Sequence, residues 1–105
     1  MNQRLPPRHK FHAKPCEDDG QWFDSKKERH RYRELKALRA VGVVTFFLRQ
    51  TRFDLPGKTV YRCDFTVFWR DGSVTFEDVK GVQTETYRLK KRQVEEAYPV
   101  EISEK

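Results

Sequence analysis

The sequence predicts a mixed α/β domain in which a central β-sheet is flanked by helices. Two segments, 26–41 and 85–97, carry apolar residues at helical spacing. The segments between them have the alternating or continuous apolar character of strands, and a short apolar segment follows the second helix. The resulting order α, β, β, β, α, β is typical of one sheet-centred layer structure. A length of 105 residues fits a single domain.

The first predicted helix begins after Ser25, which precedes Glu28 by the three residues of a capping box. Gly42 supplies its C-terminal stop. The predicted inner face consists of Tyr32, Leu35 and Leu38. Glu28 lies on or beside that face, because it is four residues before Tyr32. Two interpretations of Glu28 stay open: it closes the end of the helix, or it points into an acidic site.

The remaining elements follow from alternation and turn residues. The predicted strands are 43–48, 53–55, 59–70 and 74–80, with a short last strand at 100–102. Thr84 is the candidate cap of the second helix, and Pro99 ends it.

The turn between the two long strands decides which carboxylates meet. In the favoured register, residues 70–72 form a loop with a left-handed glycine, and Trp69 pairs with Ser73. This register brings the apolar residues of both strands together on one face, and it sets Asp64 opposite Asp78. A two-residue turn would direct Asp78 to the other side of the sheet.

A cross-strand pair of carboxylates is unfavourable, because like charges repel and their burial costs free energy. A divalent cation would remove the conflict, since hard cations bind carboxylate oxygens. Lys80 lies next along the same strand face. The alternative is that Lys80 alone neutralises the pair as a structural ion network.

The charge balance favours a polyanionic partner. The chain has 22 Lys and Arg against 16 Asp and Glu, a net charge of +6, and nucleic acid is the foremost candidate. We expect residues 1–20 to form a basic arm and residues 21–105 a single folded domain. The candidate phosphate-binding residues are Arg88, Lys90, Lys91 and Arg92 in the second helix and Arg8 and Lys10 in the arm.

Other features of the sequence are weaker. Cys16 and Cys63 are not expected to form a disulfide, since nothing marks the chain as secreted. His9, His12 and Cys16 have a spacing that suggests a zinc site, but a fourth ligand is missing. No apolar segment approaches the roughly 18 residues of a membrane span, and no signal peptide is expected. The expected location is therefore the cytoplasm.

The acidic and basic residues named above carry a resemblance to the PD-(D/E)XK nuclease superfamily, whose core has the order αβββαβ. The matching residues are Asp64 on one strand and Asp78-Val79-Lys80 on the next. Glu28 matches the acidic residue that the first helix often supplies in that superfamily.

A narrower resemblance covers residues 12–92. Here the chain is similar to small, mostly uncharacterised phage and prophage proteins of the same superfamily, through the stretches HAKPCEDDGQWFDSKKERHRYRELKAL, CDF, FEDVKG and TYRLKKR. Two departures stand out. Cys63 occupies the nominal proline position before Asp64, and Glu77 adjoins Asp78. The second departure leaves the identity of the second strand carboxylate open.

The resemblance implies a restriction-endonuclease-like core and a metal-dependent DNA endonuclease with little sequence specificity, encoded by a phage or prophage and acting in a bacterial host cell. It implies Mg²⁺, with Mn²⁺ as a substitute, held by Asp64, Asp78, the backbone carbonyl of Val79 and sometimes a carboxylate such as Glu28. Lys80 would orient the attacking water or stabilise charge in the transition state. The implied partner is duplex or branched DNA.

Three other functions compete with this one. The first is a structure-selective junction or flap nuclease of the Holliday-junction resolvase type, which would act as a homodimer. The second is a catalytically inactive DNA-binding module, against which the retention of all four polar residues speaks. The third is an RNA-binding protein, which the lack of a strand signature with RNA-stacking aromatics weakens.

Overall fold

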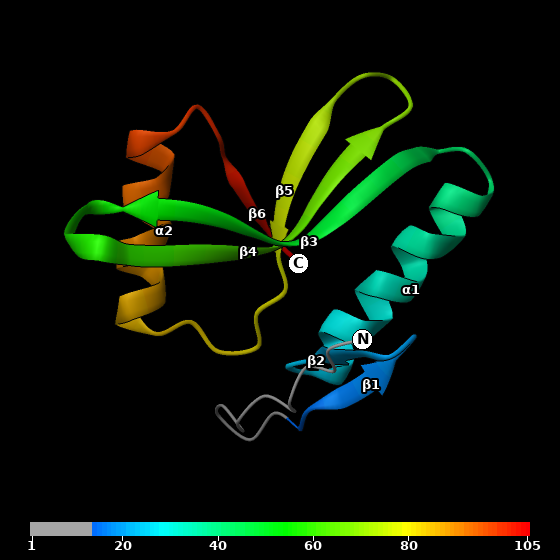
Figure 1. Ribbon diagram of the computed structural model, residues 1–105, viewed down its shortest axis with the longest axis horizontal. Helices are drawn as coiled ribbons and strands as arrows, with labels where there is room; N and C mark the ends of the chain where they lie inside the picture. Colours follow the sequence, from blue (N-terminus) through cyan, green and yellow to red (C-terminus); the bar gives the residue numbers. More distant parts are fainter. Residues whose placement is uncertain (1–13) are drawn as a thin grey trace.

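The computed structural model describes residues 14–105, which form a four-stranded sheet, two helices and a small hairpin (Figure 1). The elements in chain order are β1 (Cys16–Asp18), β2 (Gln21–Phe23), α1 (Lys26–Ala40), β3 (Val44–Leu55), the 3-10 turn η1 (Pro56–Lys58), β4 (Thr59–Trp69), β5 (Val74–Asp78), α2 (Glu85–Ala97) and β6 (Ile102–Glu104). The mixed α/β class and the expected order from the first helix onward are confirmed.

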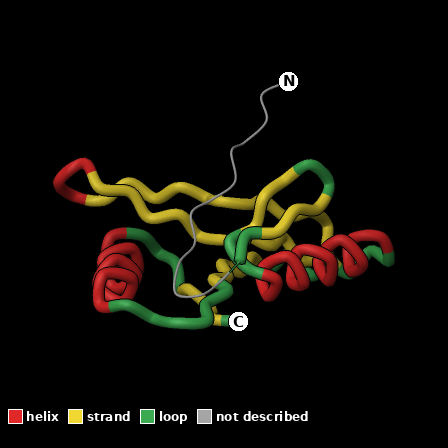
Figure 2. The backbone as a smooth tube through the Cα atoms, turned by 90° about the horizontal axis from the view of Figure 1, so that it is seen from below, coloured by secondary structure: helices red, strands yellow, loops and turns green. Residues whose placement is uncertain are grey.

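The main sheet has the strand order β3-β4-β5-β6, antiparallel except for the parallel pair β5 and β6. The helix α2 makes the crossover between these two parallel strands. In Figure 2 both helices lie on the same side of the long β3–β4 ribbon, one toward each end. No helix among the described residues is long and apolar enough to cross a membrane.

Each helix covers its own part of the core. On α1, Tyr32 and Leu35 are buried and Leu38 packs at the margin, which confirms the predicted inner face. The first cluster also contains Phe23, Val44, Phe65, Val67 and Val79. The second cluster surrounds Val94 of α2 and contains Phe53, Leu55, Tyr61, Cys63 and Ile102.

The division of β4 between these clusters was not expected. The strand period of two places Tyr61, Cys63, Phe65 and Val67 on one face of β4. The first two nevertheless pack in the α2 cluster and the last two in the α1 cluster. The change falls at Asp64. There the β3–β4 ladder skips the Gln50–Asp64 pair, and Gln50 has a left-handed φ of 56°. Such an irregularity bends a strand and re-aims a side chain.

The predicted turn between β4 and β5 is confirmed. The N–H of Trp69 donates to the carbonyl of Ser73 at 2.9 Å, and Gly72 has a φ of 91°. The ladder then pairs Thr66 with Phe76 and Phe68 with Val74. This register sets Asp64 across from Asp78, just beyond the last paired residues.

Three predicted boundaries were wrong. The strand expected at 74–80 ends at Asp78. The strands expected at 43–48 and 53–55 are one continuous strand, β3, because the left-handed Gln50 interrupts the alternation without ending the pairing with β4. The last strand begins at Ile102 rather than at residue 100. Val100 instead packs against the α2 cluster, and the N–H of Ile102 donates to the Glu95 carboxylate at 2.8 Å.

The β1–β2 hairpin was also missed, and the boundary expected at residue 20 falls inside it. Asp19 and Gly20 form its turn, with φ values of 51° and 72°. Positive φ at both central residues is the type I′ geometry that Asp-Gly favours. The signal was therefore present in the sequence, but three-residue strands are too short to show periodicity.

A buried ion pair joins α1 to β5. Glu77 is only 1% exposed, and both its oxygens accept hydrogen bonds from Arg31 at 2.7 Å. We expect Glu77→Ala to lower the free energy of unfolding by about 3 kcal/mol or more, because it leaves the Arg31 charge without its partner. Urea denaturation followed by circular dichroism would measure the loss.

The matched control is the double variant Arg31→Met/Glu77→Leu, which replaces the pair by apolar side chains of similar volume. It should recover most of the stability that Glu77→Ala loses. If Glu77→Ala lowered the free energy of unfolding by less than about 1 kcal/mol, as expected for an exposed ion pair, the pair would not stabilise the fold as a buried one does.

Candidate active site

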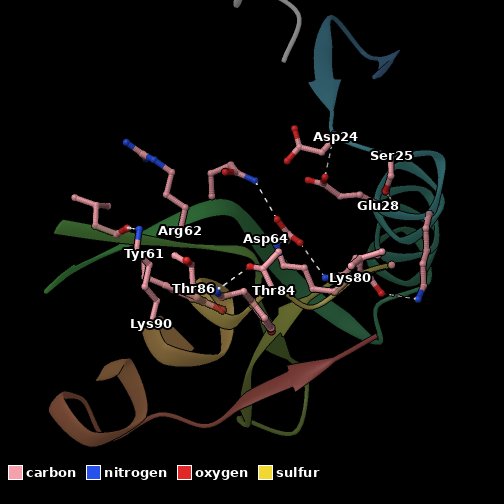
Figure 3. Close-up of a pocket in the computed structure, with 17 residues that line it drawn as sticks. Asp24, Ser25, Glu28, Tyr61, Arg62, Asp64, Lys80, Thr84, Thr86 and Lys90 are labelled. Carbon is pink, nitrogen blue, oxygen red and sulfur yellow. Dashed lines mark hydrogen bonds between the residues drawn. The ribbon is translucent and has the colours of Figure 1, made fainter. Parts of the chain in front are cut away.

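A cleft of about 680 Å³ lies between the first turns of α1 and α2 (Figure 3). Its walls are residues 24–28, the bent middle of the β3–β4 ribbon, and the segment from Val79 to Lys90. Because the N-terminal ends of both helices line this cleft, their unpaired N–H groups and dipoles favour an anion there.

Two carboxylates close the end of the β4–β5 ladder by crossed hydrogen bonds. Asp64 Oδ2 accepts the N–H of Val79 at 2.9 Å, and Asp78 Oδ1 accepts the N–H of Asp64 at 3.0 Å. Asp64 is 5% exposed and lines the cleft, whereas Asp78 is fully buried behind it. The two predicted partners are therefore joined by a bond from the N–H of Asp64 to the Asp78 carboxylate, and Asp64 itself binds the N–H of the residue after Asp78.

The second oxygen of each carboxylate is poorly satisfied. Asp78 Oδ2 is buried and forms no hydrogen bond of ordinary geometry within residues 14–105. The Tyr87 hydroxyl, also buried and without such a bond among these residues, is near enough to lower the pKa of Asp78. Asp64 Oδ1 has only a long contact of 3.4 Å from the Gln50 amide. Burial raises the pKa of both carboxyls. The Lys80 ammonium, the backbone N–H donors and the side chains of Gln50 at Asp64 and Tyr87 at Asp78 oppose this only in part. The site thus holds negative charge without full compensation.

Glu28 combines the two interpretations that the sequence left open. The Ser25 hydroxyl accepts the N–H of Glu28, and Glu28 Oε2 accepts the N–H of Asp24, both at 3.1 Å. This is a capping box shifted by one residue. Glu28 also lines the cleft with Asp64, and it is 2% exposed. Its burial and the charges of Asp64 and Asp24 raise its pKa to about 7.

Arg49 holds Glu28 in place, a role that the sequence did not indicate. Its guanidinium donates to Glu28 Oε1 at 3.1 Å, to the carbonyl of Trp22 at 3.1 Å and to the Gln21 amide oxygen at 2.8 Å. It also lies 3.9 Å from the centre of the Phe23 ring. Arg49 therefore ties the β1–β2 hairpin to the acidic side of the cleft.

The Lys80 ammonium lies 5.0 Å from the centre of the Tyr87 ring. Within residues 14–105 it forms no ion pair at 4.0 Å or less, so it does not neutralise Asp64 or Asp78 by direct contact. It is nevertheless near enough to lower the pKa of both. A cation that touches neither carboxylate stays free to meet an anionic ligand.

The structure distinguishes the two adjacent carboxylates of β5. Glu77 turns toward α1 and pairs with Arg31, whereas Asp78 contacts the backbone of Asp64. Asp78 is thus the residue that completes the predicted constellation.

The predicted phosphate-binding residues do not all reach the cleft. Lys90 lines it, but Lys91 pairs with Glu104 at 2.6 Å, and Arg88 and Arg92 are exposed outside its lining. Arg8 and Lys10 lie outside the described residues.

Other lining residues were missed: Asp24, Lys27, Gln50 and Arg62. The strand period of two places Arg62 on the same face as Asp64, and Lys27 shares a helical turn with Glu28, so both carried a signal. Asp24 becomes part of the site through the unrecognised hairpin, and nothing in the sequence marks Gln50.

No group of three or more His, Cys, Asp and Glu side chains within residues 14–105 is arranged to hold a metal ion. Both described cysteines are free, and the Cys16 thiol donates to the carbonyl of Ser25 at 3.3 Å. His9 and His12, the other members of the weak zinc pattern, lie outside the described residues.

Fold and cleft together define a small α/β domain that presents recessed carboxylates beside unpaired cations. The chain belongs to the family described as "Protein of unknown function (DUF1064)", which matches residues 8–103. Among curated proteins, none matches the chain.

The raised pKa of Glu28 makes stability depend on pH. Its value of about 7 in the folded chain exceeds the ordinary 4.5, so the folded protein takes up a proton as pH falls through 7. We expect the stability of the wild type relative to Glu28→Gln to rise by up to about 3 kcal/mol between about pH 8 and about pH 5. Urea denaturation at both pH values, with EDTA present, would measure this.

Glutamine keeps an acceptor for the N–H of Asp24, so the wild type and Glu28→Gln differ mainly in the titration of the Glu28 carboxyl. Asp78 titrates in both proteins, whereas the difference between them includes the mutual effect of Glu28 and Asp64, which raises the pKa of Glu28. A difference in stability that stayed constant with pH, or that favoured the wild type at the higher pH, would contradict the assignment.

Proposed function

We propose that this protein is a metal-dependent nuclease that hydrolyses phosphodiester bonds in DNA, as its resemblance to the PD-(D/E)XK superfamily implies. The observation that carries the proposal is the buried, unpartnered Oδ2 of Asp78 within the described residues, beside Asp64 and the free ammonium of Lys80. Uncompensated titratable groups in a cleft are typical of a reaction centre.

The donor chemistry fits a divalent cation such as Mg²⁺ or Mn²⁺. Asp64 Oδ1 and Asp78 Oδ2 are hard oxygen donors with spare capacity, and Val79 lines the cleft beside them. Glu28 fits less directly, because both its oxygens already accept hydrogen bonds. When bound, the cation supplies Lewis-acid polarisation of a phosphoryl oxygen and lowers the pKa of its water.

The chain's own side chains would bind and orient the phosphate. Held over the Tyr87 ring, the Lys80 ammonium is available to stabilise negative charge on the phosphoryl group or to hold the attacking water. Lys27, Arg62 and Lys90 line the same cleft, and none of them forms an ion pair within residues 14–105. By contrast, the cations that form ion pairs lie outside the lining, among them Arg33, Lys36, Arg52 and Lys91.

The first test is cleavage of labelled single-stranded, duplex, flap and four-way-junction DNA with Mg²⁺, Mn²⁺ or EDTA. We expect metal-dependent cutting by the wild type, reduced about 100-fold or more in Lys80→Ala, because a charge-stabilising group is lost. Arg39→Ala is the matched control. It removes one exposed cation from the last turn of α1, outside the cleft, and should leave the rate unchanged.

The substrate that is cut fastest would decide between a general and a junction-selective nuclease. Binding of DNA without any cutting by the wild type would replace the proposal with a non-catalytic DNA-binding module.

Metal binding has its own readout in stability. We expect saturating Mg²⁺ or Mn²⁺ to raise the melting temperature of the wild type by several degrees, because a ligand at about 100 times its Kd adds about 2.7 kcal/mol. Asp78→Asn should abolish the shift and the cleavage while leaving DNA binding largely intact.

The control for this second test is Asp71→Asn, which alters an exposed carboxylate in the β4–β5 turn. It should retain the metal-dependent shift. An unchanged wild-type melting curve up to millimolar metal would remove the basis for a metal site at Asp64 and Asp78.

A further inference from the structure

We infer that the α2 side of the cleft binds an unpaired nucleobase, so that the substrate strand enters the site single-stranded rather than as intact duplex. The inference rests on the proposed function and names its substrate class. It follows from the depth of the cleft, from the chemistry of its two sides and from the placement of its cations.

Asp64 belongs to the buried part of the cleft lining. The floor includes Glu28, Tyr61, Asp64 and Val79, which are all buried, whereas Lys27, Arg62 and Val82 are exposed at the rim. A scissile phosphate must descend past this rim to reach Asp64. The neighbouring phosphates of a duplex cannot easily follow, since double-stranded DNA is stiff over this length. A flexible single strand can bend into the cleft.

The two sides of the cleft differ in chemistry, with Asp64 between them (Figure 3). The α1 side carries Asp24 and Glu28. The lining from the α2 side has no carboxylate and consists of apolar, aromatic, hydroxyl and basic residues: Val60, Tyr61, Arg62, Val82, Thr84, Thr86, Tyr87 and Lys90. Val82 is 55% exposed. Apolar walls with a few polar groups are the usual lining of a site for a planar organic ligand.

The size of the cleft suits a nucleotide. Its volume of about 680 Å³ lies within the range of small-molecule sites and is far below what a segment of duplex needs. Cations that form no ion pair within residues 14–105 stand on both sides of Asp64. Lys27 lies toward α1, and Lys80, Arg62 and Lys90 lie toward α2. A strand that crosses the cleft would therefore meet a cation on each side of the scissile phosphate.

The α2 side then receives the base attached to that phosphate. In a duplex this base is paired and stacked, so its insertion requires extrusion from the helix, which costs free energy. In a single strand the cost is much smaller. The exposed Arg62 guanidinium adds a flat surface on which a base can stack.

The test is equilibrium binding measured by fluorescence anisotropy, with EDTA present so that no cleavage occurs. The labelled probes are a short single strand, the blunt duplex of the same length, and a single strand of the same length with abasic sites. We expect the single strand to bind roughly tenfold more tightly than either of the others. The abasic strand keeps every phosphate, so it separates base binding from charge attraction.

Val82→Asn should bring the affinity for the normal strand close to that for the abasic strand, because it removes apolar surface from the proposed base site. Val74→Asn is the matched control. Val74 is 42% exposed at the start of β5, outside the cleft lining, and its variant should bind as the wild type does. Melting curves of both variants would establish that they fold.

Equal affinity for normal and abasic strands, or tighter binding of the duplex, would overturn the inference. Neither result would touch the nuclease proposal, because metal-dependent cutting of duplex could still be observed. Conversely, base-dependent binding without any cutting would support the base-binding site and contradict the nuclease proposal.

Discussion

The crossed hydrogen bonds between Asp64 and the end of β5 are the interaction on which the site depends. Where β4 and β5 separate, their backbone N–H groups lose their ladder partners and need others. The two carboxylates supply these, Asp64 to Val79 and Asp78 to Asp64. The separation of the strands is therefore stabilised by Asp64, which lines the cleft, and by Asp78, which is buried behind it. Moving either carboxylate would leave a buried N–H, that of Asp64 or of Val79, without its hydrogen-bond acceptor.

A second constraint is the pair of neighbouring residues Arg49 and Gln50 in β3, which connect other parts of the cleft to these carboxylates. Arg49 binds Glu28 and the β1–β2 hairpin, while the next residue, Gln50, is left-handed and reaches Asp64. At this position the β3–β4 ribbon bends, and the two halves of the ribbon pack against different helices. The neighbours Arg49 and Gln50 thus contact acidic residues of the cleft, Arg49 at Glu28 and Gln50 at Asp64. The first turns of both helices line the cleft together with Asp64.

Much of this arrangement could be predicted from local rules. The Ser25 cap and the three-residue turn at Gly72 depend on spacing within a few residues, and both were found as expected. The Glu28 carboxylate instead accepts the N–H of Asp24, one residue before the cap. What could not be predicted depends on distant packing. Nothing local marks Gln50 as left-handed, and the split of β4 between two clusters follows from that bend. The Asp19-Gly20 turn was visible, but its strands are stabilised by Arg49, far along the chain.

The contrast between Glu77 and Asp78 argues that the poor satisfaction of Asp78 is functional. These neighbours on β5 are both buried carboxylates. Glu77 receives two hydrogen bonds from Arg31, whereas Asp78 keeps an oxygen without a partner among the described residues. The fold is therefore able to satisfy a buried carboxylate fully at this very strand. At Asp78 it instead places the nearest cation, Lys80, over a tyrosine ring rather than in contact. A purely structural network would gain stability by closing that contact, since an unpaired buried charge is costly. An open arrangement of carboxylates and cations in one cleft is what a ligand that carries both a metal ion and a phosphate requires.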